Sequence, residues 1–403
     1  MTSPKPGLPV GPFADAPAPQ TQTQTLSSGQ LIRRQFRKNR LAVISIWLLL
    51  TLYLLAALAD FVSPYGEAEA FFRGQIDRSF APPTQIHWRD PGSGKLTQPF
   101  VYNVSSELNL DTLEFDYKED TSRAYPVEFL TRGTPYTPFP LNVIPVTWRN
   151  SLHFNPQVNF HLFGVQKPAT IFLWGADRLG RDIFGRILFG ARVTLTIGIF
   201  AALISLVLGL LLGAVAGYYG GLIDDLIMRT VEILATIPAL FLLLALRSLF
   251  PLDAKSSVVF FVVIVILGFI RWGGVARAVR GQVLSLREED FVMAARSLGA
   301  SDWRIILRHV LPSTASFTIV SLSLLIPGFI LTESGLSFLG LGISDPNSSW
   351  GLMLAVAQEG GLQTFTSRPW MLLPGLFIFV TVLAFNFIGD GLRDAFDPKS
   401  RSR

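Results

Sequence analysis

The sequence predicts an all-α polytopic membrane protein with six transmembrane helices and a small, β-containing extracytoplasmic insertion. Half of its 403 residues are hydrophobic and 16% are charged, whereas about a quarter of an average soluble protein is charged. The apolar residues gather in runs of roughly twenty, the length at which a helix crosses a bilayer core of about 30 Å. A long polar segment with strand-like alternation separates the first two runs.

Composition also excludes several classes of protein. The chain contains no cysteine, so it is not a disulfide-stapled scaffold. Its net charge of +5 would suit a nucleic-acid partner if the protein were soluble. In a membrane protein, however, an excess of Lys and Arg usually lies on the cytoplasmic flanks of the spans. We therefore expect the lipid bilayer, and no nucleic acid, around this chain.

The N-terminal region divides into a tail and a first span. Residues 1–30 are rich in proline and contain a TQTQT tract, and we expect a disordered cytoplasmic tail there because so little apolar surface is available. Residues 31–62 hold the first transmembrane helix, an apolar run at 41–59, together with its basic flank. That flank consists of Arg33, Arg34, Arg37, Lys38 and Arg40. Basic residues next to a span face the cytoplasm, so this helix is predicted to run outward.

Residues 63–175 form the predicted extracytoplasmic insertion. The segment is polar and rich in proline and aromatic residues, and stretches such as 100–104 alternate in the manner of β-strands. An amphipathic stretch follows at 176–192, with Ile183, Phe184, Ile187 and Leu188 on one helical face. Charged residues occupy the rest of that helix, so we expect an interfacial elbow helix that lies along the membrane surface.

A five-helix core is predicted for residues 193–396. Its apolar runs cover 195–215, 231–250, 258–270, 316–331 and 371–388. The run at 258–270 must extend through Val275 to span the bilayer. With the first span, the total of six places both termini in the cytoplasm, and the arginine-rich loops fall on that same side.

The loop at 279–312, between the predicted fourth and fifth spans, is too polar to cross the membrane. Its first half has helical composition, and Gly299 suits the left-handed position that ends such a helix. Ser301 is then the predicted N-cap of a second helix, with Asp302 in its first turn, and Pro312 is expected to end that helix. The pattern predicts a helix, a glycine turn and a second helix. An ordinary amphipathic connector would show the same pattern.

The residues of this loop resemble those of a known family. Ala294, Ala295 and Gly299, followed by Leu311 and Pro312, are similar to the cytoplasmic "EAA" loop of ATP-binding-cassette (ABC) importer permeases. The motif has a fixed order and spacing, and the spacer before the Leu-Pro pair has the expected length.

Three further segments resemble the second permease type of the peptide/nickel branch of this family, which imports dipeptides and oligopeptides. They are Asp177-x2-Gly180-Arg181-Asp182, the LSFLGLG string at 336–342 and the GDGLRD string at 389–394. Met293 and His309 depart from the general motif, which has glutamate and isoleucine there, although the string RHVLP around His309 is common in the peptide branch. The resemblance covers residues 177–398 and the first span.

The resemblance implies the type I ABC importer permease fold and a permease subunit that forms half of a translocation pathway for peptides or similar small solutes. The implied partners are a second homologous permease, two ABC ATPases and an extracytoplasmic solute-binding protein, in a bacterial cytoplasmic (inner) membrane. The resemblance also assigns coupling to the ATPases to nine residues of the loop: Glu289, Ala294, Ala295, Gly299, Ser301, Asp302, Trp303, Leu311 and Pro312. The substrate stays open among dipeptides, oligopeptides, nickel chelates and peptide antibiotics.

The sequence contains no catalytic or metal-binding motif that we can identify. Gly92-Ser-Gly-Lys95 lacks the earlier glycine and the following Ser or Thr of a phosphate loop, and there is no HExxH. The four histidines show no ligand spacing. We therefore expect a non-catalytic subunit that binds no metal or cofactor itself, with ATP and Mg²⁺ held by the partner ATPases.

Two polar residues within the predicted spans are candidates for the translocation path, Glu333 near the outer end of the fifth and Asn386 in the sixth. A charged group in a span usually faces a cavity or a partner, so Glu333 is predicted to have a structural or cavity-lining role. A secondary transporter or channel that works alone would need inverted repeats or charged groups at mid-membrane. A membrane-bound enzyme would need a catalytic constellation. The sequence contains neither pattern.

Overall fold

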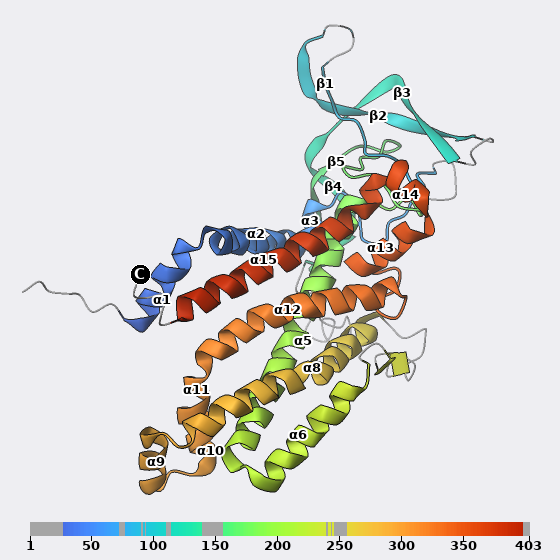
Figure 1. The fold of residues 1–403 in the computed structure, drawn as a ribbon. Helices are drawn as coiled ribbons and strands as arrows, with labels where there is room; N and C mark the ends of the chain where they lie inside the picture. Colours follow the sequence, from blue (N-terminus) through green and yellow to red (C-terminus); the bar gives the residue numbers. More distant parts are fainter. Residues whose placement is uncertain are drawn as a thin grey trace, which may run out of the picture.

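The computed structural model describes residues 27–71, 77–89, 92, 94–109, 114–138, 156–238, 241–242, 244–245 and 256–397. Long helices form a bundle, and two small β-sheets lie at one end of it (Figure 1). Two short helices, α9 (Asp290–Ser297) and α10 (Asp302–Ile305), lie at the opposite end. The predicted fold class, a helical membrane protein with a β-containing insertion, is confirmed.

Five helices in the described part of the chain are long and apolar enough to cross a membrane. They are α2 (Arg40–Ala57), α5 (Ile183–Tyr219), α8 (Ser256–Leu286), α12 (Ala315–Phe338) and α15 (Leu373–Phe396). Each contains all or most of a predicted apolar run, and α8 extends past Val275 as the length argument required. The predicted run at 231–250 begins in α6 (Gly221–Thr236) and continues partly outside the described residues, so a sixth span stays a prediction.

The helix α5 is continuous over 37 residues, which makes it about 56 Å long at 1.5 Å per residue. Asp182 caps its N-terminus by accepting the backbone N–H groups of Phe184 and Gly185. The prediction of a separate interfacial elbow at 176–192 is therefore wrong. Arg186, on the charged side of this segment, does not face water or lipid headgroups, because it is only 2% exposed and pairs with acidic residues of the same chain.

Glycines allow α5 and α8 to pack closely. Gly209, Gly213 and Gly217 recur every four residues along α5. A Cβ atom added to Gly213 would lie 2.5 Å from the carbonyl oxygen of Ala276, and one added to Gly217 would lie 2.8 Å from that of Arg280. The two backbones thus meet where α5 has no side chain, which is a common way for membrane helices to associate.

The remaining long helices complete the core around α5. α12 packs against α5 and α15, and α15 packs against α2. The main cluster of buried side chains lies among them and includes Leu195, Phe329 and Trp350. Trp350 begins α13 (Trp350–Glu359) and donates its indole N–H to the carbonyl oxygen of Ile187 at 3.0 Å. The shorter helices are α1 (Ser28–Lys38), α3 (Ala59–Val62), α14 (Leu362–Thr366) and the 3-10 turn η3 (Pro369–Leu372).

The insertion contains the predicted strands in two antiparallel sheets. One consists of β1 (His87–Arg89), β2 (Leu96–Asn109) and β3 (Glu114–Pro126), in that order, and in the other β4 (Glu128–Tyr136) pairs with β5 (Val158–Gly164). Val101 and Tyr125 of the first sheet share a buried cluster with Phe163 of the second. The two sheets therefore form one small folded unit.

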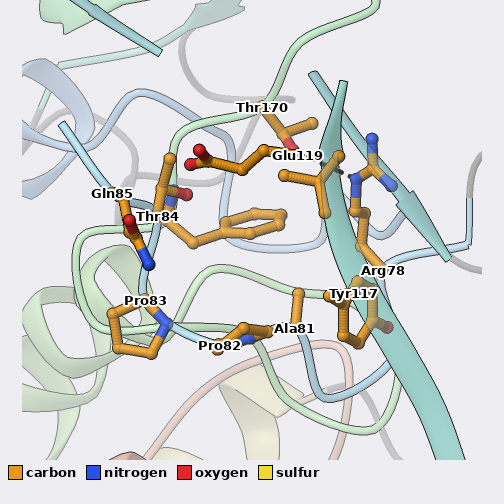
Figure 2. A pocket seen from close by; sticks show the side chains of 11 residues that line it. Arg78, Ala81, Pro82, Pro83, Thr84, Gln85, Tyr117, Glu119 and Thr170 are labelled. Atoms are coloured by element: carbon orange, nitrogen blue, oxygen red, sulfur yellow. Dashed lines mark hydrogen bonds between the residues drawn. The ribbon is translucent and has the colours of Figure 1, made fainter. Parts of the chain in front are cut away.

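A buried arginine fixes the first sheet to the rest of the insertion. The guanidinium of Arg78 donates from Nε to Thr170 Oγ1 at 3.2 Å and from Nη2 to Asn103 Oδ1 at 2.9 Å. Figure 2 shows Arg78, Thr170 and Tyr117 at the wall of a pocket of about 80 Å³. Burial lowers the pKa of Arg78, and the two neutral acceptors offset part of the cost of burying its charge.

Candidate functional site

The two short helices at the end of the bundle opposite the sheets are the first candidate site (Figure 1). α9 ends at a turn in which Gly299 adopts a φ of +77°, the left-handed conformation predicted for it. α10 follows, and a π-helical segment, η2 (Ile306–Val310), leads into α11 (Leu311–Ser313). We term α9, the Gly299 turn, α10 and η2 together the helix pair.

The predicted N-terminus of α10 agrees with the structure, whereas the predicted end of the second helix does not. Ser301 occupies the N-cap position of α10 with extended dihedrals, and Glu289 that of α9, although neither side chain makes a capping hydrogen bond. The prediction that the second helix ends at Pro312 is wrong. Pro312 stands in the first turn of α11, where a residue without an N–H group is tolerated, and the helical path continues to Thr314.

One side of the helix pair is buried against the bundle. Its fully buried side chains are Val292, Ile305, Ile306 and Val310. They pack in one cluster with residues of α5 and α8, among them Tyr218 and Val283. Ala295 and Leu311, two of the predicted coupling residues, pack at the edge of this cluster. The helix pair is thus seated firmly on the ends of α5 and α8.

The other side of the helix pair exposes large apolar side chains. The exposed fractions are 41% for Phe291, 51% for Met293, 88% for Leu298, 54% for Trp303 and 53% for Leu307. We term these five residues the apolar surface of the helix pair. Five large exposed apolar side chains within so short a segment make it a candidate interaction site. Of the five, only Trp303 was predicted from the sequence as a coupling residue, while the predicted Ala294 and Pro312 are exposed as well.

Tyr218, near the end of α5, ties the helix pair to that helix. Its hydroxyl donates to Asp302 Oδ1 at 2.8 Å and accepts from Arg296 Nη2 at 3.0 Å. The hydrogen bond to Tyr218 raises the pKa of Arg296. Sequence reasoning missed Tyr218, because it is 84 residues from Asp302 and no local pattern connects the two.

A second polar site lies at the start of α5, at the end of the bundle that carries the sheets. Arg181 donates to Asp177 at 2.7 Å and to Asp345 at 2.6 Å. Arg186 lies 3.7 Å from Asp177 and 3.4 Å from Asp345. We term these four residues the ionic cluster. It joins the Asp177 motif to the loop before α13, two segments that the sequence could not place together.

Two further carboxyl groups lie near the ionic cluster. Glu67, at the start of the insertion, accepts the backbone N–H of Ser348 at 2.6 Å, and burial raises the pKa of Glu67. Burial also raises the pKa of Asp182, the cap of α5, to about 7. Both groups accept backbone N–H groups: Glu67 thereby joins the insertion to the loop before α13, whereas Asp182 caps its own helix, α5.

The two candidates for the translocation path occupy different surroundings. Glu333 is fully buried in α12. Its carboxylate accepts the hydroxyls of Ser337 at 2.7 Å, Thr194 of α5 at 3.0 Å and Ser334 at 3.4 Å. These contacts join α5 to α12. Asn386 is half-buried in α15, and a role in the path stays a prediction for both residues.

Two protein families match this chain. Residues 209–402 match the family described as binding-protein-dependent transport system inner membrane component. Residues 27–83 match the N-terminal TM domain of oligopeptide transport permease C. The first range contains the helix pair and Glu333, and the second contains α1, α2 and Glu67.

Individual relatives are similar over more than half of the chain. The oligopeptide transport system permease protein OppC of Haemophilus influenzae is 45% identical over 229 residues, which are 57% of this chain and 70% of that protein. The dipeptide transport system permease protein DppC of Bacillus subtilis is 43% identical over 58% of this chain and 71% of that protein. A solved structure, the inward-facing MetNI methionine ABC transporter, matches 53% of this chain and 97% of that chain with a TM-score of 0.40 and 17% identity. The chain is more than 40% identical to both relatives over more than two thirds of their length. It therefore belongs to the binding-protein-dependent transport system inner membrane components, the permease subunits of ABC importers.

Proposed function

We propose that this permease forms half of a translocation pathway for peptides or similar small solutes. The complex contains a second homologous permease, two ABC ATPases and an extracytoplasmic solute-binding protein. It lies in the bacterial cytoplasmic membrane, with both termini of this chain inside. The names of the relatives, which refer to oligopeptides and dipeptides, support a peptide-like substrate.

The observation that carries this proposal is the two-sided character of the helix pair. Its inner side is packed on α5 and α8, and its outer side carries the apolar surface. A groove on an ATPase that receives this surface would remove it from water, at a gain of roughly 25 cal/mol per Å² of apolar area. The helix pair is therefore the coupling site, with Trp303 and Leu298 as its most prominent contacts.

Coupling follows from the rigid seat of the helix pair. When ATP brings the two ATPases together, each helix pair moves with its ATPase, and Tyr218 transmits the displacement to the end of α5. The bundle then changes from inward-open to outward-open in a rigid-body movement. ATP drives the change because it binds one of the two states more tightly. The partner ATPases hold ATP and Mg²⁺, and this chain carries out no chemical step.

A site-specific photo-crosslinker tests the assignment of the coupling site. Placed at Leu298 or at Trp303, it should capture an ABC ATPase that mass spectrometry identifies, with a yield that changes when ATP is added. Leu130 of β4 is a matched control, because it is also a large exposed side chain, at 61%, but lies at the opposite end of the bundle. Capture of the ATPase at Leu130 and at neither site in the helix pair would overturn the assignment. Peptide uptake by liposomes that contain this chain alone would overturn the proposed function.

A further inference from the structure

The helix α1 precedes the first membrane-spanning helix directly and has one strongly basic side. It ends at Lys38, Asn39 breaks the helix with a ψ of 96°, and α2 begins at Arg40. The basic face of α1 consists of Arg33, Arg34, Arg37 and Lys38. At 100° per residue these four positions fall within an arc of about 140°, with Ile32 and Phe36 on the other side. α1 is therefore amphipathic, with its charge concentrated on one face.

The apolar side of α1 is packed against α15. Phe36 lies beside Gly391, where an added Cβ atom would be 3.2 Å from the Cε2 atom of the phenyl ring. Asn39 accepts the backbone N–H of Ala42 at 3.1 Å and so holds the bend between α1 and α2. These contacts leave the basic face pointing away from the bundle.

The side chains of the basic face are available to a ligand. All four are exposed, and in the part of the chain that the structure describes none of them takes part in an ion pair. Three arginines of the α5 region, Arg181, Arg186 and Arg192, are in contrast little exposed and are each paired with a carboxylate. Among the described residues, nothing therefore blocks the basic face from binding an anionic partner.

Position and charge together identify that partner. α2 is long and apolar enough to span a membrane, so α1 lies at the depth of the lipid headgroups. Anionic phospholipids present phosphate groups at this depth, and each basic residue near such a surface strengthens binding by about fivefold. Guanidinium groups can also donate two parallel hydrogen bonds to one phosphate. We propose that the basic face of α1 binds the headgroups of anionic phospholipids in the leaflet that α1 borders. The bound headgroups fix α1 at the membrane surface and, through Phe36, steady the end of α15.

Native mass spectrometry of the full-length protein tests this lipid site. The purified protein is offered equal amounts of phosphatidylglycerol and phosphatidylcholine in detergent, and the retained lipids are counted. We expect the wild type to retain several-fold more phosphatidylglycerol than phosphatidylcholine. The R33Q/R34Q/R37Q variant should bring this ratio close to one. The charge-conserving R33K/R34K/R37K variant should keep most of the preference.

A matched control removes the same charge from another surface. Arg89, Arg123 and Arg132 are exposed residues of the two sheets, and the R89Q/R123Q/R132Q variant should retain lipids as the wild type does. Rising salt should lower the preference of the wild type, because it screens exposed charges, and this measurement needs no variant. Equal retention of the two lipids by the wild type, or a preference that ignores both salt and the α1 substitutions, would overturn the proposal. Loss of a co-purifying ATPase from R33Q/R34Q/R37Q with unchanged lipid retention would assign the face to a protein partner and overturn it as well.

Discussion

The backbone of Gly299 sets the angle between the two helices of the helix pair. Its φ is +77°, and an added Cβ atom would meet nothing within 4 Å, so a side chain there would cost only conformational strain of about 1–2 kcal/mol. We expect Gly299→Val to reach the membrane normally but to tilt α10 out of its ATPase groove. ATPase activity stimulated by the loaded binding protein should be lost in the reconstituted complex, with Gly299→Ala intermediate.

Gly94 provides the control for this substitution. It also has a positive φ, +64°, with nothing within 4 Å of an added Cβ, but it lies beside the sheets. Gly94→Val carries the same kind of strain and should leave the stimulated ATPase rate unchanged. If the two valine variants behave alike, Gly299 is an ordinary turn residue and the coupling assignment is misplaced.

The carboxyl group of Asp182 gives the protein a pH-dependent contribution to stability. Burial raises its pKa from 3.8 to about 7, so the folded protein binds this proton more tightly than the unfolded chain does. The contribution is complete below about pH 4 and is lost as the pH rises through 7. Asparagine caps a helix as well as aspartate does and does not titrate. Between pH 5 and pH 8, the Tm of the detergent-solubilised wild type should therefore fall relative to that of Asp182→Asn. A constant difference in Tm would show that Asp182 does not titrate in this range.

A functional residue could be predicted from the sequence when its partners are close to it along the chain, and could not when they are distant. Gly299, Ser301 and Asp302 were predictable because turn and cap chemistry depends on immediate neighbours. Tyr218 was not, since its partner Asp302 is 84 residues away. Arg186 belongs to the segment that we expected to be an interfacial helix. Its partner Asp345 lies 159 residues further along the chain, so only the fold brings the two together.

At the scale of helices, the contact between α5 and α8 depends on the absence of side chains. An added Cβ at Gly213 would lie 2.5 Å from the carbonyl oxygen of Ala276, so Gly213→Ala must push the two helices apart. We expect a loss of about 1–3 kcal/mol, as for other overpacked contacts. Thermal unfolding in detergent should show a clear drop in Tm.

Gly281 of α8 is the matched control for Gly213. It is exposed, and nothing lies within 4 Å of a Cβ added there. Alanine favours a helix by up to about 1 kcal/mol over glycine, so Gly281→Ala should be neutral or slightly stabilising. A Tm that falls equally in both variants would mean that backbone proximity is not what matters at Gly213.

Apolar periodicity and length were enough to predict the five long helices of the described residues, because burial in lipid acts on whole runs of residues. The same two signals could not show whether residues 176–192 form a separate elbow helix or part of a longer continuous helix. That distinction depends on whether a charged face meets water or protein, and here Ile183 and Ile187 pack against Met353 and Met371 on helices distant in sequence. The strands of the insertion were predictable in kind, but not their pairing into two sheets.

For the whole molecule, the six-span topology can be tested by cysteine labelling, because the native chain has no cysteine. Ser105 on β2, Ser301 in the helix pair and Ser367 before η3 are all exposed. In intact cells, an impermeant thiol reagent should label Ser105→Cys and Ser367→Cys but not Ser301→Cys. Permeabilised cells should show labelling of all three. Labelling of Ser301→Cys from outside would contradict the predicted orientation.

The length of α5 has a mechanical consequence. At about 56 Å it exceeds the roughly 30 Å of a bilayer core, and it contains no proline at which to kink. Arg186 lies in its first turns and Tyr218 near its other end. A tilt of about 10° around its midpoint would carry the two ends roughly 5 Å in opposite directions. Because α5 joins the two sites, a rigid tilt of this helix would move the ionic cluster and the helix pair together.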